Sequence, residues 1–221
     1  VFNVSGNIIC DEQEISGVRV ALRRYLSNGN GGFEWTDIAE IKPVSTDENG
    51  DFAFNNIMLG DKLLFTTDDY KIEDYLIDDM SNIQIFAQKY FTATITVNEN
   101  GAPLENAVIV CENQTDLLTD TRGIVEITQC LDSFTVTVSK EGYTAKNITI
   151  TAQNNQSSVI LDKYFDLNLT VHSGEIILNS ANVWVNNTLY TLNENGTLLV
   201  ENCLKTITVE VLQDKYNAMT I

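Results

Sequence analysis

The sequence of 221 residues contains the same pattern three times. The segment Lys89–Phe91 recurs as Lys163–Phe165, and Phe2 takes the corresponding place near the start of the chain. From these points the copies align in register, and each includes a strand in which apolar residues alternate with residues of variable polarity. Alternation at period two turns one face of such a strand toward a core. The aligned apolar positions are Val18, Val20 and Leu22, then Ala107, Ile109 and Cys111, then Ala181, Val183 and Val185.

β-Branched residues at period two dominate the rest of the chain, as in residues 91–97, 134–138 and 204–211. Turn signals separate these runs, and no stretch carries a sustained helical stripe. Gly50, Gly123 and Gly196 take the same place in each copy, where glycine supplies the positive φ of a tight turn. The sequence therefore predicts an all-β fold.

Three copies of one supersecondary pattern predict three small β-sandwich domains in tandem, at residues 1–89, 90–163 and 164–221. The joints contain no run of Gly, Ser or Pro, which indicates short and stiff linkers. Stiff tandem sandwiches would form a rod. Within the first copy, residues 25–35 form an insertion that we interpret as a long hairpin with a Gly/Asn tip.

The third copy is shorter than the others. Ile221 aligns with Ile148, so the third copy has no counterpart of the terminal strand around residues 159–161. A sandwich without that strand has an unpaired edge over its core. Two alternatives follow: either the chain continues, or a strand from another subunit completes the sandwich by β-augmentation.

The charge balance limits the classes of partner. The chain has 31 acidic and 13 basic residues, a net charge of -18. Nothing in it could neutralise a row of phosphates, and an anionic lipid surface would repel it, so we expect neither nucleic acid nor a membrane as partner. No apolar run approaches the roughly 18 residues of a membrane helix. The residues after Val1 do not contain the charged region and the apolar region of a targeting signal. We therefore interpret the chain as processed or trimmed.

Several segments of the first copy resemble the carboxypeptidase regulatory-like domain. They are Gly17–Leu22, Thr46–Phe54, Asn56–Gly60 and Tyr70, and the third copy matches least well. The resemblance implies a prealbumin-like (Ig-like) seven-stranded sandwich, related to the B-type repeats of collagen adhesins. It also implies a non-catalytic spacer, stalk or interaction domain in an extracellular or cell-surface protein.

Some adhesin repeats of that kind carry a Lys–Asn isopeptide bond. Here the first copy has no Lys in its first strand, and Lys89 and Lys163 precede the first strands of the following copies. We therefore expect no such bond.

The four cysteines leave two alternatives. Cys111 and Cys130 both fall in core positions of the second copy, so they are candidates for a buried disulfide. In the third copy, however, Cys203 aligns with Cys130, while Val185 aligns with Cys111. Cys203 therefore has no cysteine partner at the aligned position, and a single buried thiol fits the position of Cys130 equally well. Cys10 lies at a strand end, and we expect it to be exposed.

Two kinds of modification or metal site are predicted. Asp47, Asn49 and Asp51 flank one turn and offer the oxygen ligands of a calcium site. Sequons for N-glycosylation form the second set. They occur at Asn3, Asn113, Asn147, Asn155, Asn168, Asn186 and Asn195.

Catalysis has little support in the sequence. His172 is the single histidine, and no Ser or Cys stands at a motif spacing from it. We therefore expect no enzyme activity and, calcium apart, no cofactor.

Three functional hypotheses remain. The first is a stalk, or the repeating subunit of a surface filament or sheath, which self-associates or binds other surface proteins and could exchange strands between subunits. The second is an adhesin that binds protein or glycan through Trp35 or Trp184. The third is the accessory region of a secreted enzyme.

Overall fold

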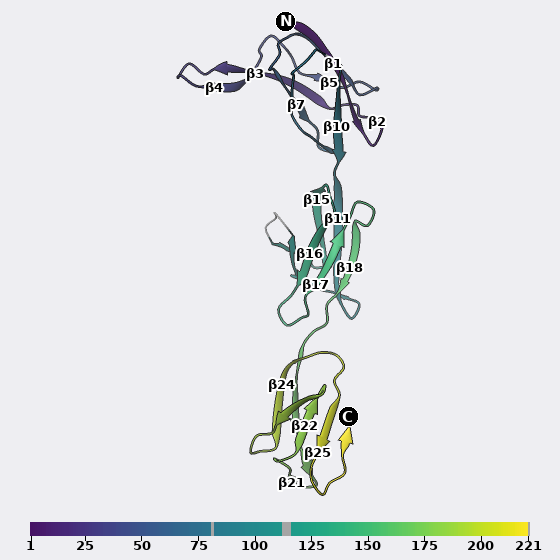
Figure 1. The fold of residues 1–221 in the computed structure, drawn as a ribbon. Helices are drawn as coiled ribbons and strands as arrows, with labels where there is room; N and C mark the ends of the chain where they lie inside the picture. Colours follow the sequence, from purple (N-terminus) through teal and green to yellow (C-terminus); the bar gives the residue numbers. More distant parts are fainter. Residues whose placement is uncertain (81, 112–115, 221) are drawn as a thin grey trace. The chain divides into compact units, whose positions relative to one another are not determined.

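The computed structural model describes residues 1–80, 82–111 and 116–220 (Figure 1). Every regular element among them is a β-strand, which confirms the all-β prediction. None of these residues belongs to a helix long and apolar enough to cross a membrane. The chain divides into two compact units, one of Val1–Thr92 with Thr128–Leu131, the other of Ala93–Ile127 with Asp132–Ile221. The division into three domains stays a prediction.

The first unit contains two sheets that face each other. The strands of one sheet are β1 (Phe2–Cys10), β2 (Gln13–Glu14), β6 (Asp51–Ile57), β8 (Tyr70–Ile72) and β10 (Ile83–Lys89). The strands of the other are β3 (Arg19–Ser27), β4 (Phe33–Asp37), β5 (Val44–Ser45), β7 (Lys62–Thr66) and β9 (Tyr75–Leu76). β1 lies between β6, which is antiparallel to it, and β10, which is parallel.

The core of the first unit lies between these sheets. Ile8, Ile57, Val20 and Leu63, two from each sheet, are fully buried in one cluster, while Arg19 on the outer face of β3 is exposed. The alternation of buried and exposed side chains predicted for β3 is therefore confirmed. Each aliphatic side chain buried in this way contributes about 1.5–3 kcal/mol to stability.

The second copy has the same arrangement. One sheet contains β11 (Phe91–Glu99), β12 (Ala102–Pro103), β15 (Ile124–Cys130) and β18 (Gln156–Ile160). The other contains β13 (Val108–Cys111), β14 (Leu117–Leu118), β16 (Phe134–Ser139) and β17 (Lys146–Ile150). β18 is parallel to β11, as β10 is to β1.

The third copy has smaller sheets. Its strands are β19 (Phe165–Thr170), β20 (His172–Ser173), β21 (Ile176–Ile177), β22 (Asn182–Val185), β23 (Thr188–Thr191), β24 (Thr197–Cys203), β25 (Val209–Leu212) and β26 (Met219–Thr220). β19 pairs with β24, and β22 lies between β23 and β25. The strand expected at residues 204–211 is shorter than predicted, because β25 begins only at Val209.

One turn has the same hydrogen bonds in all three copies. Asp47 Oδ1 accepts the backbone N–H groups of the residues two and four positions later, and Asp120 and Asn193 do the same at 2.8–3.0 Å. The glycine three residues after each acceptor has positive φ, between 66° and 71°, as predicted. Because Asn replaces Asp in the third copy, the turn needs a hydrogen-bond acceptor there rather than a negative charge.

In each of the first two copies, a buried threonine makes hydrogen bonds to the backbone of an earlier segment of the same copy. Thr46 Oγ1 accepts the N–H of Val18 at 3.0 Å and donates to the carbonyl of Ile15 at 2.8 Å. Thr119 makes the same pair of bonds in the second copy, at 2.8 and 2.7 Å. In the third copy Leu192 takes this position and is buried. The third copy has thus replaced this polar link with an apolar contact.

Candidate functional sites

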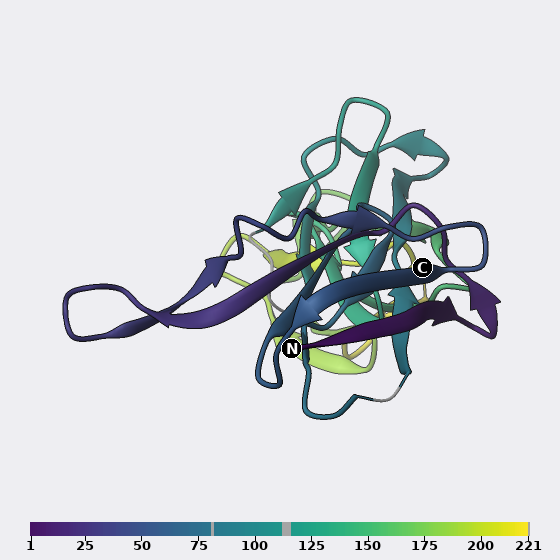
Figure 2. The ribbon, with the colours of Figure 1, turned by 90° about the horizontal axis from the view of Figure 1, so that it is seen from above.

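The first candidate is the hairpin of β3 and β4, which projects from the first unit (Figures 1 and 2). Asn28 shapes its tip, because its side-chain oxygen accepts the N–H groups of Asn30 and Gly32 at 3.0 and 3.1 Å. Gly29 and Gly31 both have positive φ. The predicted hairpin with a Gly/Asn tip is confirmed.

Three aromatic side chains lie together on this hairpin. The exposed fractions of Tyr25, Phe33 and Trp35 are 54%, 61% and 36%. The Tyr25 ring stacks on Phe33 with centroids 5.6 Å apart, and it lies 5.3 Å from the Trp35 ring. Cross-strand pairing explains the contact with Trp35, since Tyr25 and Trp35 are directly opposite in the ladder.

A hollow of about 640 Å³ lies at the base of the hairpin. Trp35, Met58 and Leu76 line it together with Tyr25. We call these four residues and Phe33 the aromatic surface. Lys62 Nζ lies 5.5 Å from the centre of the Trp35 ring, a cation–π distance. Exposed aromatic faces beside a cation can stack on a sugar ring or on another aromatic side chain.

A buried ion pair supports the base of the hairpin. The Asp61 side chain is 1% exposed, and its carboxylate accepts bonds from Arg24 Nε at 2.6 Å and Nη2 at 2.7 Å. The N–H of Met58 donates to the same carboxylate at 2.8 Å. The hydrogen bond to Asp61 raises the pKa of Arg24, so the guanidinium stays charged. The pair connects β3 to the loop that precedes β7.

The other predicted interaction residue, Trp184, has a different environment. It lies in β22 opposite Leu189 on one side and Glu210 on the other. The side chain is half-buried. Trp184 is therefore less accessible than its position on the outward-facing side of the strand suggested.

The second candidate is an open sheet edge in the third copy. β1 pairs with both β6 and β10, and β11 pairs with both β15 and β18. Within the described residues β19 pairs with β24 alone. A groove of about 440 Å³ lies beside this edge, lined by Leu169, Val171, Leu178, Val211 and Tyr216 among others. We call it the edge groove.

The four cysteines lie in buried positions of the structure. Cys10, Cys111, Cys130 and Cys203 are all buried and unbonded to each other. The candidate disulfide between Cys111 and Cys130 is absent from the structure, and burial raises the pKa of the Cys111 thiol, which disfavours the reactive thiolate. Cys10 was expected to be exposed, and that expectation is wrong.

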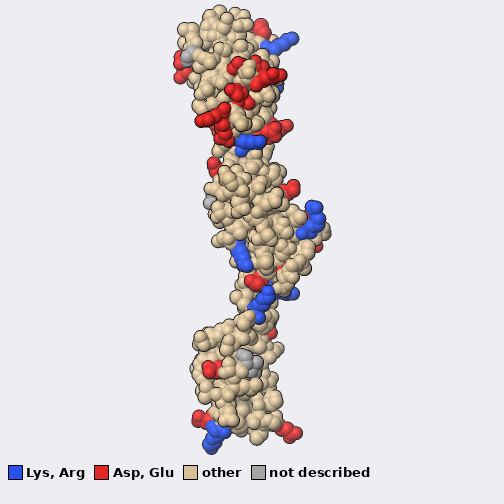
Figure 3. Space-filling model, turned by 90° about the vertical axis from the view of Figure 1, so that its right-hand side faces the viewer, with Lys and Arg blue, Asp and Glu red and all other residues tan. Residues whose placement is uncertain are grey.

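The predicted calcium ligands form part of the repeated turn. Asn49 and Asp51 each donate a backbone N–H to Asp47 Oδ1 at 2.9 Å, so this oxygen already has two partners. Within the described residues no group of three or more His, Cys, Asp or Glu is arranged to hold a metal ion. Acidic side chains gather instead on the face of the first unit seen in Figure 3. Calcium binding at Asp47, Asn49 and Asp51 stays a prediction.

The predicted glycosylation sites differ in accessibility. Asn155 is half-buried, and Asn113 lies outside the described residues. Asn186 is exposed, but its side-chain oxygen accepts the N–H of Thr208 at 3.0 Å. Glycosylation stays a prediction. The other exposed sequons are Asn3, Asn147, Asn168 and Asn195.

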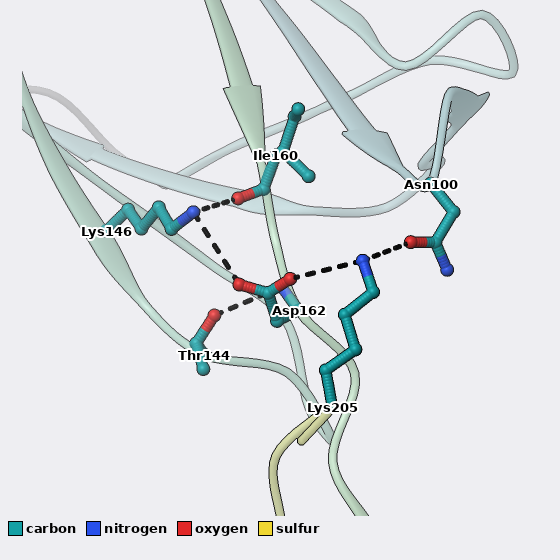
Figure 4. A network of polar contacts seen from close by, with 6 residues as sticks. All are labelled: Asn100, Thr144, Lys146, Ile160, Asp162 and Lys205. Atoms are coloured by element: carbon teal, nitrogen blue, oxygen red, sulfur yellow. Dashed lines mark hydrogen bonds and ion pairs between the residues drawn. The ribbon is translucent and has the colours of Figure 1, made fainter.

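A polar network lies beside the joint between β18 and β19 (Figure 4). Lys205 Nζ donates to Asn100 Oδ1 at 2.7 Å and lies 4.0 Å from Asp162 Oδ1. Lys146 Nζ lies 3.8 Å from the other carboxylate oxygen of Asp162. All three charged side chains are at least one-third exposed, so each pair contributes no more than about 1 kcal/mol. The network holds no nucleophile paired with a base.

No protein-family model matches the chain, and no curated protein matches it. Solved structures similar to it include a streptococcal ancillary pilin, with 14% identity and a TM-score of 0.38, over 73% of this chain and 62% of that one. A minor pilin of Streptococcus agalactiae has 14% identity and a TM-score of 0.39, over 78% and 100%. The shaft pilin of Lactobacillus rhamnosus GG has 11% identity and a TM-score of 0.34, over 72% and 96%.

This chain thus spans less than two thirds of the streptococcal ancillary pilin. At these identities and scores the likenesses carry no argument about function. The resemblance to the carboxypeptidase regulatory-like domain stays a prediction.

Proposed function

We propose that the protein is a non-catalytic extracellular structural protein, serving as a stalk or as the repeating subunit of a surface filament or sheath. The observation that carries this proposal is how the copies join. Only Tyr90 separates the end of β10 from the start of β11. The last strand of one sandwich therefore continues almost directly into the first strand of the next, which suits a load-bearing chain of domains.

Hydrogen bonds at both joints support a stiff connection. Tyr90 donates its N–H to the carbonyl of Asp69 at 2.9 Å. At the second joint Tyr164 donates to Gly142 at 2.8 Å, and Thr144 donates to Asp162 at 2.9 Å. Each joint is thus bonded to the sandwich that precedes it, whereas a flexible linker would be solvated.

The proposal predicts an elongated particle. A compact protein of 221 residues has a radius of gyration of about 17 Å. For the purified chain we expect small-angle X-ray scattering to give a value at least half as large again, because stiff joints keep the sandwiches apart. Electron microscopy of antibody-labelled cells should place the protein in surface filaments or sheaths. A radius near 17 Å, or labelling only inside cells, would contradict the proposal.

The aromatic surface favours a second candidate function, adhesion to a glycan or to a protein. Its rings are exposed on the hairpin of β3 and β4. An exposed apolar cluster of this kind is typical of a binding site. The two functions are compatible, since a stalk can carry an adhesive hairpin.

Trp35→Ala tests the adhesive function. On an array of immobilised oligosaccharides and extracellular-matrix proteins, we expect the variant to lose at least tenfold in affinity for any ligand that the native chain binds. The stability of the first unit should fall only slightly, because the cation–π contact with Lys62 contributes about 0.5–1 kcal/mol. Phe86→Ala is the matched control, since Phe86 is an exposed aromatic residue of the same unit on β10. Equal binding by both variants would rule out the aromatic surface as the site.

A further inference from the structure

We propose that Asn30, at the tip of the hairpin of β3 and β4, is a site of spontaneous deamidation, and that its isoaspartyl product opens the tip. The reaction modifies the chain with water alone as co-reactant. It does not depend on the stalk function, although its consequence concerns the hairpin that carries the aromatic surface. Four features support the assignment.

The first feature is the sequence at the tip. In an Asn–Gly pair the backbone nitrogen of the glycine can attack the side-chain amide carbon of the asparagine, and glycine obstructs this attack least because it has no Cβ. Asparagine is accordingly one of the residues that heat damages most readily. Five asparagines of the chain precede a glycine, namely Asn28, Asn30, Asn49, Asn100 and Asn195.

The second feature is the protection of two of these pairs in the repeated turn. Gly50 and Gly196 are buried, and each donates its N–H to the carbonyl of the residue three positions earlier, at 3.0 and 2.9 Å. A nitrogen held in this way cannot turn toward the side chain of the preceding asparagine without breaking a hydrogen bond. We therefore expect Asn49 and Asn195 to be protected in the folded chain.

The third feature is the freedom of Gly31. This glycine is exposed, and no group among the described residues accepts its N–H. Its φ is +84°, and no atom lies within 4 Å of the position that a Cβ would take. The tip of a projecting hairpin is also where a chain moves most easily (Figure 2). The nucleophile of the reaction is thus unprotected at this position.

The fourth feature is the side chain of Asn30. Asn28 Oδ1 accepts two N–H groups, from Asn30 and Gly32, and Asn100 Oδ1 accepts Lys205 Nζ at 2.7 Å. Both of these amide groups must break hydrogen bonds before they rotate toward the following glycine. The Asn30 side chain is exposed and makes no hydrogen bond within the part of the chain that the structure describes. Asn30 therefore combines a free amide group with a free glycine nitrogen.

The reaction balances with water alone. The Gly31 nitrogen loses its proton to solvent and forms a bond to Cγ of Asn30, while the Cγ–Nδ2 bond breaks and the amide nitrogen leaves as ammonia. Water then opens the resulting cyclic imide at either carbonyl. Opening at Cγ gives aspartate, whereas opening at the backbone carbonyl gives isoaspartate, whose main chain passes through Cβ and Cγ.

Isoaspartate would lengthen the main chain of the tip by a carbon atom. Asn28 closes the tip, because its N–H donates to the carbonyl of Gly32 at 3.0 Å and its Oδ1 accepts the Gly32 N–H at 3.1 Å. An extra atom between these residues moves both bonds away from their geometry. Phe33 follows directly and stacks on Tyr25, so an open tip would loosen the outer end of the aromatic surface.

Ageing of the purified chain tests the site. The folded chain is incubated at physiological temperature and mildly alkaline pH, and peptide mapping by mass spectrometry follows the change from amide to acid at each Asn–Gly pair. We expect Asn30 to react at least tenfold faster than Asn49 and Asn195, and in concentrated urea the three rates should become similar. Equal rates in the folded chain, a faster reaction at Asn28 or Asn100, or a tenfold difference that persists in urea would overturn the proposal.

Two variants separate the longer main chain from the added charge. Asn30→Asp has the charge of the products without the extra atom, and Asn30→Gln keeps an amide whose longer side chain does not form the same ring. We expect hydrogen exchange at the Gly32 amide to be at least tenfold faster in the isoaspartyl fraction of the aged chain than in either variant. Equal exchange in that fraction and in Asn30→Asp would overturn the opening of the tip. The scattering experiment on the stalk is unaffected by either result.

Discussion

Replacing Asp61 with alanine (D61A) is expected to destabilise the first unit by about 3–5 kcal/mol. The Asp61 side chain is 1% exposed and accepts three hydrogen bonds, two from Arg24 and one from the N–H of Met58. Its removal would leave the Arg24 guanidinium, whose side chain is itself only 22% exposed, beside an apolar methyl group. Urea denaturation followed by Trp35 fluorescence, in a Trp184→Phe background, would measure the loss.

Asp37 supplies the matched control for D61A. It pairs with the neighbouring Arg23 at 2.7 Å, but its side chain is 77% exposed. Asp37→Ala (D37A) should therefore cost less than about 1 kcal/mol, because water screens the pair and solvates either partner alone. Similar losses in the two variants would contradict the importance that we assign to the burial of Asp61.

The sequence predicted those parts of the fold that local patterns determine. In β3 the exposed Arg19 and the buried Val20 alternate, because a strand turns successive side chains to opposite faces. The glycines of the repeated turn were identified because positive φ depends mainly on the turn itself. The hairpin of β3 and β4 was likewise recognisable from its Gly- and Asn-rich tip.

Contacts between distant segments could not be predicted in this way. Asp61 follows a glycine in an acidic chain and looks like a solvated turn residue, but it pairs with Arg24, 37 positions earlier. Thr46 resembles any strand threonine, and only the fold brings it to the backbone of Val18 and Ile15. Cys10 is buried although it lies at a strand end, because its side chain belongs to the core cluster between the two sheets of the first unit.

The candidate sites were predicted in part for the same reason. Trp35 was identified as an interaction residue from its place in the insertion, but Met58 joins it from a loop between β6 and β7 that no motif links to the hairpin. Trp184 lies on an outward-facing position, yet its side chain is half-buried. The edge groove followed from the alignment of the copies, whereas its exposed wall at Tyr216 emerged only from the structure.

Gly123→Ala (G123A) is the second change for which we expect a large loss, about 3 kcal/mol. Gly123 has φ of +71°, and a Cβ atom there would lie 2.4 Å from the carbonyl oxygen of Val97 and 2.9 Å from the backbone nitrogen of Leu104. Both neighbours are backbone atoms, so the turn must move away from β11. That movement would break the 2.7 Å hydrogen bond from the Val97 N–H to the Gly123 carbonyl.

Gly142 is the control that separates this contact from backbone strain. Its φ is +79°, close to that of Gly123, but no atom lies within 4 Å of the position that a Cβ would take. Gly142→Ala should therefore cost only the left-handed penalty of about 1–2 kcal/mol. Calorimetry of the two variants should show the larger fall in melting temperature for G123A, with faster hydrogen exchange at Val97. If the two melting temperatures fell equally, the positive φ alone would explain why glycine is needed at position 123. The close approach of the turn to the first strand of the copy would then not be the reason that all three copies have glycine there.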